Sequence, residues 1–192
     1  MDAVDVRMQD EGNEAAFGKH SALEGIAFGL TDGIICFTGL AIGIARSTRN
    51  PVLVIVATLV GGVADAFGNS IGFYISQATE RSVQKFSAER GVETQVHSSR
   101  EVAMSGVFTF VATCCVLVFM VLPFFFMELG SAIVTMPAIG TILSFVLGYY
   151  MATIGGEVPM RNAMKYAVIT VAGAVLSFVI GDALNAYFNL GS

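Results

Sequence analysis

The sequence predicts an all-α polytopic membrane protein with five transmembrane helices, on three observations. Of the 192 residues, 55% are hydrophobic and only 13% are charged. The mean hydropathy is +0.73, far above that of a water-soluble domain of this length. The apolar residues form continuous runs of roughly 20 residues, the length that a helix needs to cross a bilayer core of about 30 Å. Continuous runs favour helices over a barrel of alternating strands.

The five apolar runs define the elements in chain order. Together they form a single transmembrane domain, residues 21–192, with short connections except for the polar segment 77–100. The first part of that segment is expected to prolong the second helix, with Gly91 as its stop. We expect membrane-spanning helices at about residues 23–45, 52–76, 102–127, 132–153 and 163–188.

The first twenty residues have a different composition from the rest. They contain five acidic residues and lack both the basic start and the short apolar run of a signal peptide, so no cleavable signal is predicted. We expect residues 1–20 to form an acidic, disordered N-terminal tail.

The distribution of Lys and Arg predicts the orientation in the membrane. Eight of these residues lie on the side of the N-terminus and two on the opposite side. By the positive-inside rule, the N-terminus is cytoplasmic, and five crossings then place the C-terminus on the other side. The eight are Arg7, Lys19, Arg81, Lys85, Arg90, Arg100, Arg161 and Lys165, and the two are Arg46 and Arg49.

Composition also argues against several classes of function. The net charge is −5 and the ten basic residues are scattered, so nucleic acid is not an expected partner. The three cysteines lie in apolar runs without a CxxC motif and are interpreted as buried thiols. No HExxH or GxSxG motif is present, and His20 and His97 lie outside the spans, so we do not expect an enzyme.

Three aspartates lie within the expected spans, where a charge costs roughly 2.5–3.5 kcal/mol and is a functional candidate by default. Asp32 lies about nine residues into the first span, and Asp65 about eleven residues from the end of the second. In antiparallel neighbours this puts both carboxylates at a similar depth, as a divalent cation would require. The alternative is a protonated pair that only holds helices together. Asp182 lies near an interface and close to Asn185, so solvation or a local cap explains it as well as transport.

Helical spacing adds further groups beside the two acids. Asn69 lies one turn after Asp65 and is a candidate oxygen ligand. Thr31 and Cys36 are candidate pore-lining residues, as is Glu24 at the start of the first span. The alternatives are a threonine bonded to its own backbone, a thiol that fills space, and an ordinary charge at a helix N-terminus.

Glycines recur at intervals of four on the first two spans. Small residues with this spacing let helices approach closely in lipid, so we interpret them as residues of helix packing or dimerisation. They are Gly25, Gly29, Gly33, Gly39, Gly43, Gly68 and Gly72.

Together these features resemble the vacuolar iron transporter family. Residues 29–33 (GLTDG) look like the family's glycine-rich first helix with its Asp-Gly pair, and residues 64–67 (ADAF) look like its second helix. Residues 122–124 (LPF) and the stretch 147–181 are similar to later parts of the family pattern. The similarity spans about residues 23–188.

The resemblance implies a homodimer with a translocation path at the interface, lined by the first helices, and exchange of Fe²⁺ or Mn²⁺ for protons. By position, Asp32 would be the pore aspartate and Asp65 the second-helix aspartate. Asn69 departs from the plant-type pattern, which has methionine there, and an amide oxygen suits Mn²⁺, Mg²⁺ or Ca²⁺ better. The long glutamate-rich metal-binding domain is also missing. In its place Glu80 is a candidate for the cytoplasmic entrance, although a solvated helix face is the favoured alternative.

We therefore expect a divalent metal cation transporter, an antiporter that exports Fe²⁺ or Mn²⁺ from the cytosol against protons. It would be a homodimer without a tightly bound cofactor, in the plasma membrane or a vacuole-type membrane. One alternative is a transporter of the same fold for another cation. The other is a structural or regulatory membrane module that transports nothing.

Overall fold

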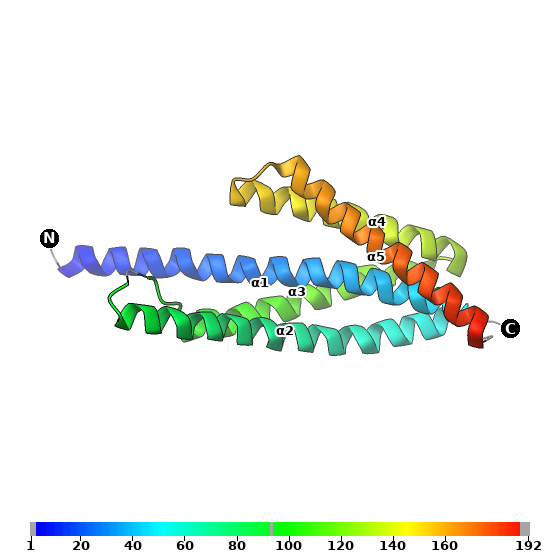
Figure 1. The fold of residues 1–192 in the computed structure, drawn as a ribbon, viewed down its shortest axis with the longest axis horizontal. Coiled ribbons are helices and arrows are strands. Elements are labelled where there is room, and N and C mark those ends of the chain that lie inside the picture. Colours follow the sequence, from blue (N-terminus) through cyan, green and yellow to red (C-terminus); the bar gives the residue numbers. More distant parts are fainter. Residues whose placement is uncertain (1–2, 93, 189–192) are drawn as a thin grey trace.

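The computed structural model describes residues 3–92 and 94–188, with side chains from Ala22 onward. Within these residues there are five α-helices and no strands (Figure 1). All five are long and apolar enough to cross a membrane, so the predicted all-α, multi-pass membrane architecture is confirmed. The helices are α1 (Ala3–Thr48), α2 (Pro51–Glu89), α3 (Ser99–Phe126), α4 (Leu129–Gly155) and α5 (Pro159–Phe188).

The start of α1 differs from the sequence prediction. Residues 1–20 were expected to form a disordered tail, whereas the helix runs without interruption from Ala3. The segment is rich in Ala, Glu, Gln and Met, which have high helix propensity, and it continues directly into the first membrane span. Residues Ala22–Thr48 of α1 are long and apolar enough to cross a membrane, and they include the predicted span 23–45.

Local signals in the sequence explain where α2 and α3 begin and end. The Asn50 side chain accepts hydrogen bonds from the backbone of Val52 and Leu53 at 3.0 and 3.3 Å, and Pro51 opens α2. At the other end, α2 extends well past the expected span, and Gly91 follows it with φ of +80°. The predicted prolongation of α2 and its stop are thus confirmed. Ser98 and Glu101 form a capping box that starts α3.

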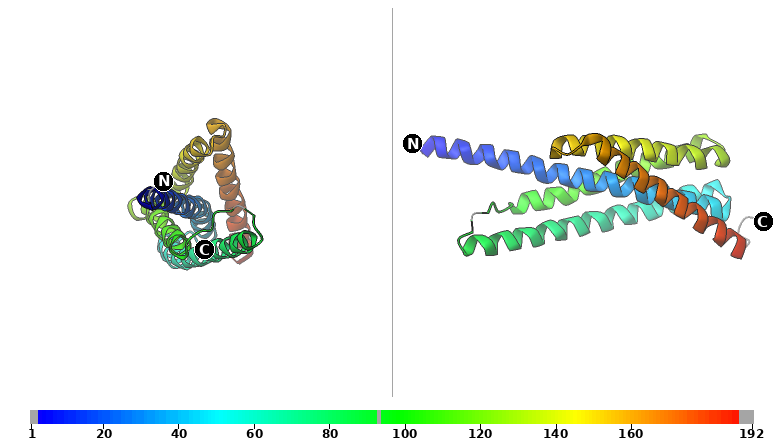
Figure 2. Two further views of the ribbon diagram at one scale, coloured as in Figure 1. Left: turned by 90° about the vertical axis from the view of Figure 1, so that its left-hand side faces the viewer. Right: turned by 45° about the horizontal axis from the view of Figure 1, so that its top comes forward.

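Helix α1 is the central element and contacts each of the other four helices (Figure 2). Its first glycines permit close contact with α3. A Cβ on Gly25 would lie 2.4 Å from the Ser105 carbonyl oxygen, and one on Gly29 would lie 2.5 Å from that of Thr109. These distances leave no room for any side chain at either position.

The remaining glycines divide into two groups. Gly33 lies against Val116 of α3, while Gly39 and Gly43 lie against Ser177 of α5. The glycines of α1 therefore serve packing within one chain. A Cβ on Gly68 or Gly72 of α2 would meet no atom of another element within 4 Å, so that face of α2 is open in the single chain.

The side chains also divide into a buried group between the helices and an exposed group on their outer faces. Phe37 of α1, Met120 of α3 and Met136 of α4 are completely buried where these helices meet. Many large apolar side chains on the outer faces are instead exposed, as expected where lipid replaces water as the surrounding solvent. The chain is therefore an integral, multi-pass membrane protein with α1 held inside the bundle.

Candidate metal-ion site

Helices α1 and α2 are antiparallel, and their facing residues follow a regular register. Each step of four residues along α1 is matched by a step of four residues back along α2. The facing pairs, from the N-terminal end of α1, are Glu24 with Gln77, Phe28 with Phe73, Asp32 with Asn69, Cys36 with Asp65 and Leu40 with Gly61.

Asn69 holds the two carboxylates together. Its Nδ2 donates one hydrogen bond to Asp32 Oδ2 and another, of 3.0 Å, to Asp65 Oδ2. All three side chains are partly buried. The residue count predicted a similar depth for Asp32 and Asp65; in the register of the two helices they lie one turn apart, and Asn69 contacts both. We call these three residues the central site.

Two other candidates lie beside the central site with different contacts. The Cys36 thiol interacts with the Asp65 carboxyl group, so it lies next to the acid pair. The Thr31 hydroxyl donates to the Ala27 carbonyl oxygen at 2.8 Å, one turn back on its own helix. Thr31 thus follows the alternative interpretation of a hydroxyl bonded to its own backbone.

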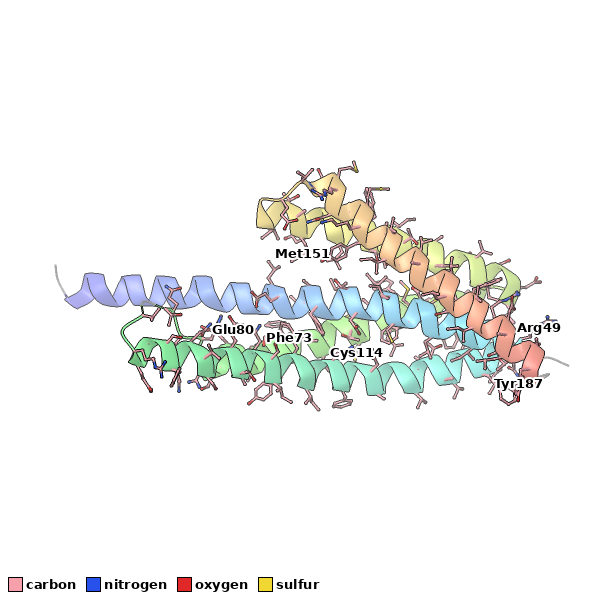
Figure 3. All side chains as sticks on the ribbon, viewed as in Figure 1. Arg49, Phe73, Glu80, Cys114, Met151 and Tyr187 are labelled. Carbon is pink, nitrogen blue, oxygen red and sulfur yellow. The ribbon has the colours of Figure 1, made fainter. Side chains whose placement is uncertain are left out.

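The remaining candidates lie nearer the end of the bundle that holds the N-terminus. Glu24 accepts a hydrogen bond of 3.2 Å from Gln77 Nε2. Glu80 accepts one of 3.2 Å from Gln84 and lies 3.9 Å from His97, with about half of its side chain exposed. Glu80 therefore lies on a solvent-exposed face of α2, as the alternative interpretation predicted, and Figure 3 labels it there.

Asp182 belongs to a separate structure at the opposite end of the bundle. Its carboxylate forms a two-point ion pair with Arg46, with N–O distances of 2.6 to 2.8 Å. Asn185 donates to the carbonyl oxygens of Arg46 and Ser47 and so caps the end of α1. We expected solvation or a local cap for Asp182; it pairs with Arg46 instead, and Asn185 supplies the cap. The ion pair was missed because Arg46 was counted only as a charge of a connecting segment.

Three residues of the α1–α2 interface, Phe28, Phe73 and Gln77, were not predicted from the sequence. The rings of Phe28 and Phe73 stack with centroids 5.0 Å apart (Phe73 is labelled in Figure 3). Gln77 is only 6% exposed, and its Oε1 has no hydrogen-bond partner. The register that extends from Asp32 and Asn69 in four-residue steps would have identified both pairs.

The α1–α2 interface lies within a stretch that is similar to a known protein family. Residues 23–99 match the model of the VIT family, and this stretch includes the central site and the motifs at residues 29–33 and 64–67. An uncharacterised protein of Methanocaldococcus jannaschii is 24% identical over 168 residues, which cover 82% of this chain and 87% of that protein.

Proposed function

We propose that this chain is a metal-ion transporter of the VIT family, the vacuolar iron transporters, and that it exchanges a divalent metal cation for protons across a membrane, because residues 23–99 match the model of that family. The observation that carries the proposal is the bridge of Asp32 and Asp65 by Asn69. A membrane-embedded pair of acids that are joined by one hydrogen-bonding residue is typical of an ion or proton relay.

The Asn69 amide occupies the place of a cation between the two acids. Its Nδ2 donates to an oxygen of each carboxylate, so these oxygens already face the position that a cation would take. When a metal ion arrives, the amide turns over and presents Oδ1 in place of Nδ2. Asp32, Asp65 and Asn69 then supply oxygen ligands, and the bridge re-forms when the ion leaves.

Proton coupling follows from the charge of the acid pair. Two carboxylates inside a membrane are stabilised by a dication, by protons or by hydrogen-bond donors. A metal ion that binds Asp32 and Asp65 displaces their protons, because a carboxylate must be deprotonated to act as a ligand. Protons taken up from the opposite side then release the metal.

The working unit in this proposal is a homodimer. Asp32, Asp65 and Asn69 are only partly buried within one chain, and Gly68 and Gly72 leave the neighbouring face of α2 uncovered. A second copy against this face would shield the acids from lipid. It would also add ligands: divalent cations take about six oxygen atoms, and the described residues of one chain contain no group of three or more His, Cys, Asp or Glu that could hold a metal ion.

The proposed direction is export from the cytosol, with the N-terminus cytoplasmic, in a plasma or vacuole-type membrane. The excess of Lys and Arg at the N-terminal end of the bundle supports this orientation. Asn69 supports Mn²⁺ over Fe²⁺ as cargo, because an amide oxygen is a hard ligand. Another hard dication, such as Mg²⁺ or Ca²⁺, is the second candidate that the same observation favours.

Transport by purified protein in liposomes tests the central proposal. Mn²⁺ uptake and internal pH are followed with two dyes for the wild type, D32A and D65N, with D182N as a control outside the central site. We expect D32A and D65N to lose at least tenfold in both fluxes and D182N to retain them. Full proton-linked Mn²⁺ and Fe²⁺ transport by both central variants would refute the assignment, and an inactive wild type with every ion tested would favour a structural module.

Cross-linking tests the homodimer separately. A G68C variant in a chain whose native cysteines are replaced by alanine should form disulfide-linked dimers in membranes. A cysteine at Gly29, which lies against α3, is unsuitable because its side chain has no space. An R161C control, on an exposed residue at one end of α5, should stay monomeric. Equal cross-linking of both variants would contradict the proposed interface.

A further inference from the structure

The pair formed by Glu24 and Gln77 lies two helical turns from the central site, on the same α1–α2 interface. Gln77 Nε2 donates to Glu24 Oε2 at 3.2 Å. The rest of the Gln77 amide is unsatisfied: the residue is only 6% exposed and its Oε1 has no partner. Most buried polar atoms in proteins are hydrogen-bonded, so an acceptor without a donor beside an acidic residue requires an explanation.

The chemistry of this pair repeats that of the central site. In both places an amide on α2 donates to a carboxylate on α1, Gln77 to Glu24 and Asn69 to Asp32. In both places the amide N–H group lies where a cation beside the carboxylate would lie. When it turns over, Gln77 presents its oxygen next to Glu24, an arrangement that is repulsive without a cation and favourable with one.

We propose that Glu24 and Gln77 form a second divalent-cation site, which we call the mouth site, at the N-terminal end of the α1–α2 interface. Its ligands are a carboxylate and an amide oxygen, so it suits a hard dication such as Mn²⁺ that keeps part of its water shell. Gln77 Oε1 has no hydrogen-bond partner in the ion-free state, and in the proposed site it binds the cation.

The stacked rings of Phe28 and Phe73 separate the mouth site from the central site. Glu24 and Asp32 are eight residues apart, which corresponds to about 12 Å along a helix. An ion that leaves the mouth site must therefore pass an apolar layer before it reaches Asp32. The mouth site holds the incoming cation on the side that the proposed orientation assigns to the cytoplasm, so this inference deepens the proposed function and rests on it.

Counting bound Mn²⁺ tests the mouth site without any transport measurement. The full chain is purified in detergent, and the loss of the free Mn²⁺ signal in electron paramagnetic resonance gives the number of ions bound per chain. The variants are E24Q and Q77L for the mouth site and D65N for the central site. E89Q, an exposed glutamate at the end of α2, is the matched control, and size-exclusion chromatography confirms that each variant is folded.

We expect two Mn²⁺ per chain in the wild type and E89Q, one in E24Q, Q77L and D65N, and none in the E24Q/D65N double variant. Dipolar broadening between ions about 12 Å apart should be present only in the wild type and E89Q. Each mouth variant should raise the dissociation constant of one site at least tenfold.

Other outcomes separate this inference from the proposed function. One Mn²⁺ per chain that survives in E24Q and Q77L but is lost in D65N overturns the mouth site and supports the central site. One Mn²⁺ that is lost in E24Q and kept in D65N supports the mouth site and contradicts the proposed role of Asp65. A wild type that binds no Mn²⁺ overturns both.

Discussion

Replacing Asn69 with leucine removes the bridge between the two acids while nearly preserving the volume of the side chain. In the wild type, Asn69 Nδ2 donates to both Asp32 and Asp65. In N69L the two carboxylates face each other across an apolar group, without a donor. The variant therefore isolates the hydrogen bonds from the packing.

The expected loss of stability can be calculated from these two bonds. Hydrogen bonds to charged groups contribute about 1.5–3 kcal/mol each. Because the three side chains are only partly buried, the lower value applies to each, which gives a total of about 3 kcal/mol. For a chain of 150–250 residues, one kcal/mol corresponds to about 2–4 °C in melting temperature, so N69L should unfold about 6–12 °C below the wild type.

Thermal unfolding of metal-free protein in detergent measures this difference, with N162L as the control. Asn162 donates to Glu157 on an exposed surface, so its loss should cost under about 0.5 kcal/mol. Melting of N69L within about 2 °C of the wild type would refute the bridge.

Three further predictions follow from other contacts. G29V should prevent folding, because its Cβ would lie 2.5 Å from a carbonyl oxygen of α3, whereas G72V should fold normally and lower the dimer fraction in size-exclusion chromatography. D182N should lower the melting temperature by about 2–4 °C, since an ion pair this exposed contributes about 1 kcal/mol, and should leave Mn²⁺ flux unchanged; a large loss of flux would place the pair in the transport path. N69M should raise both Fe²⁺ flux relative to Mn²⁺ and the number of protons exchanged per ion, as measured in liposomes; unchanged ratios would contradict the assigned role of Asn69.

The sequence was sufficient to predict the fold because the bilayer makes hydropathy decisive. A helix must satisfy its own backbone in lipid, so apolar runs of sufficient length give the number and limits of the spans. The similar depth predicted for Asp32 and Asp65 followed from the same count. Residues that end helices located the helix boundary, such as Gly91 after α2, whose positive φ suits glycine.

Contacts between helices far apart in the sequence were less accessible. The Arg46–Asp182 ion pair depends on how α1 crosses α5, where Gly43 lets Gly181 approach, and neither helix encodes that crossing by itself. The spacing of the glycines indicated close helix packing but did not identify the helix that each glycine contacts. Only the structure shows that Gly25 and Gly29 face α3, whereas Gly68 faces no element in the described part of its own chain.

In the proposed mechanism, the amide at position 69 links the structure of the central site to its coupling with protons. An ion-free acid pair in a membrane needs protons or donors to offset its charge. A methionine at this position has no N–H group, so the acids beside it must be neutralised by protons when the metal leaves. Asn69 supplies two donors of its own, and the ion-free site can therefore keep more of its negative charge. In the proposed mechanism, such a carrier would return with fewer protons per cation than one with a thioether. Asn69 would then set both the preference for hard cations and the dependence of transport on pH.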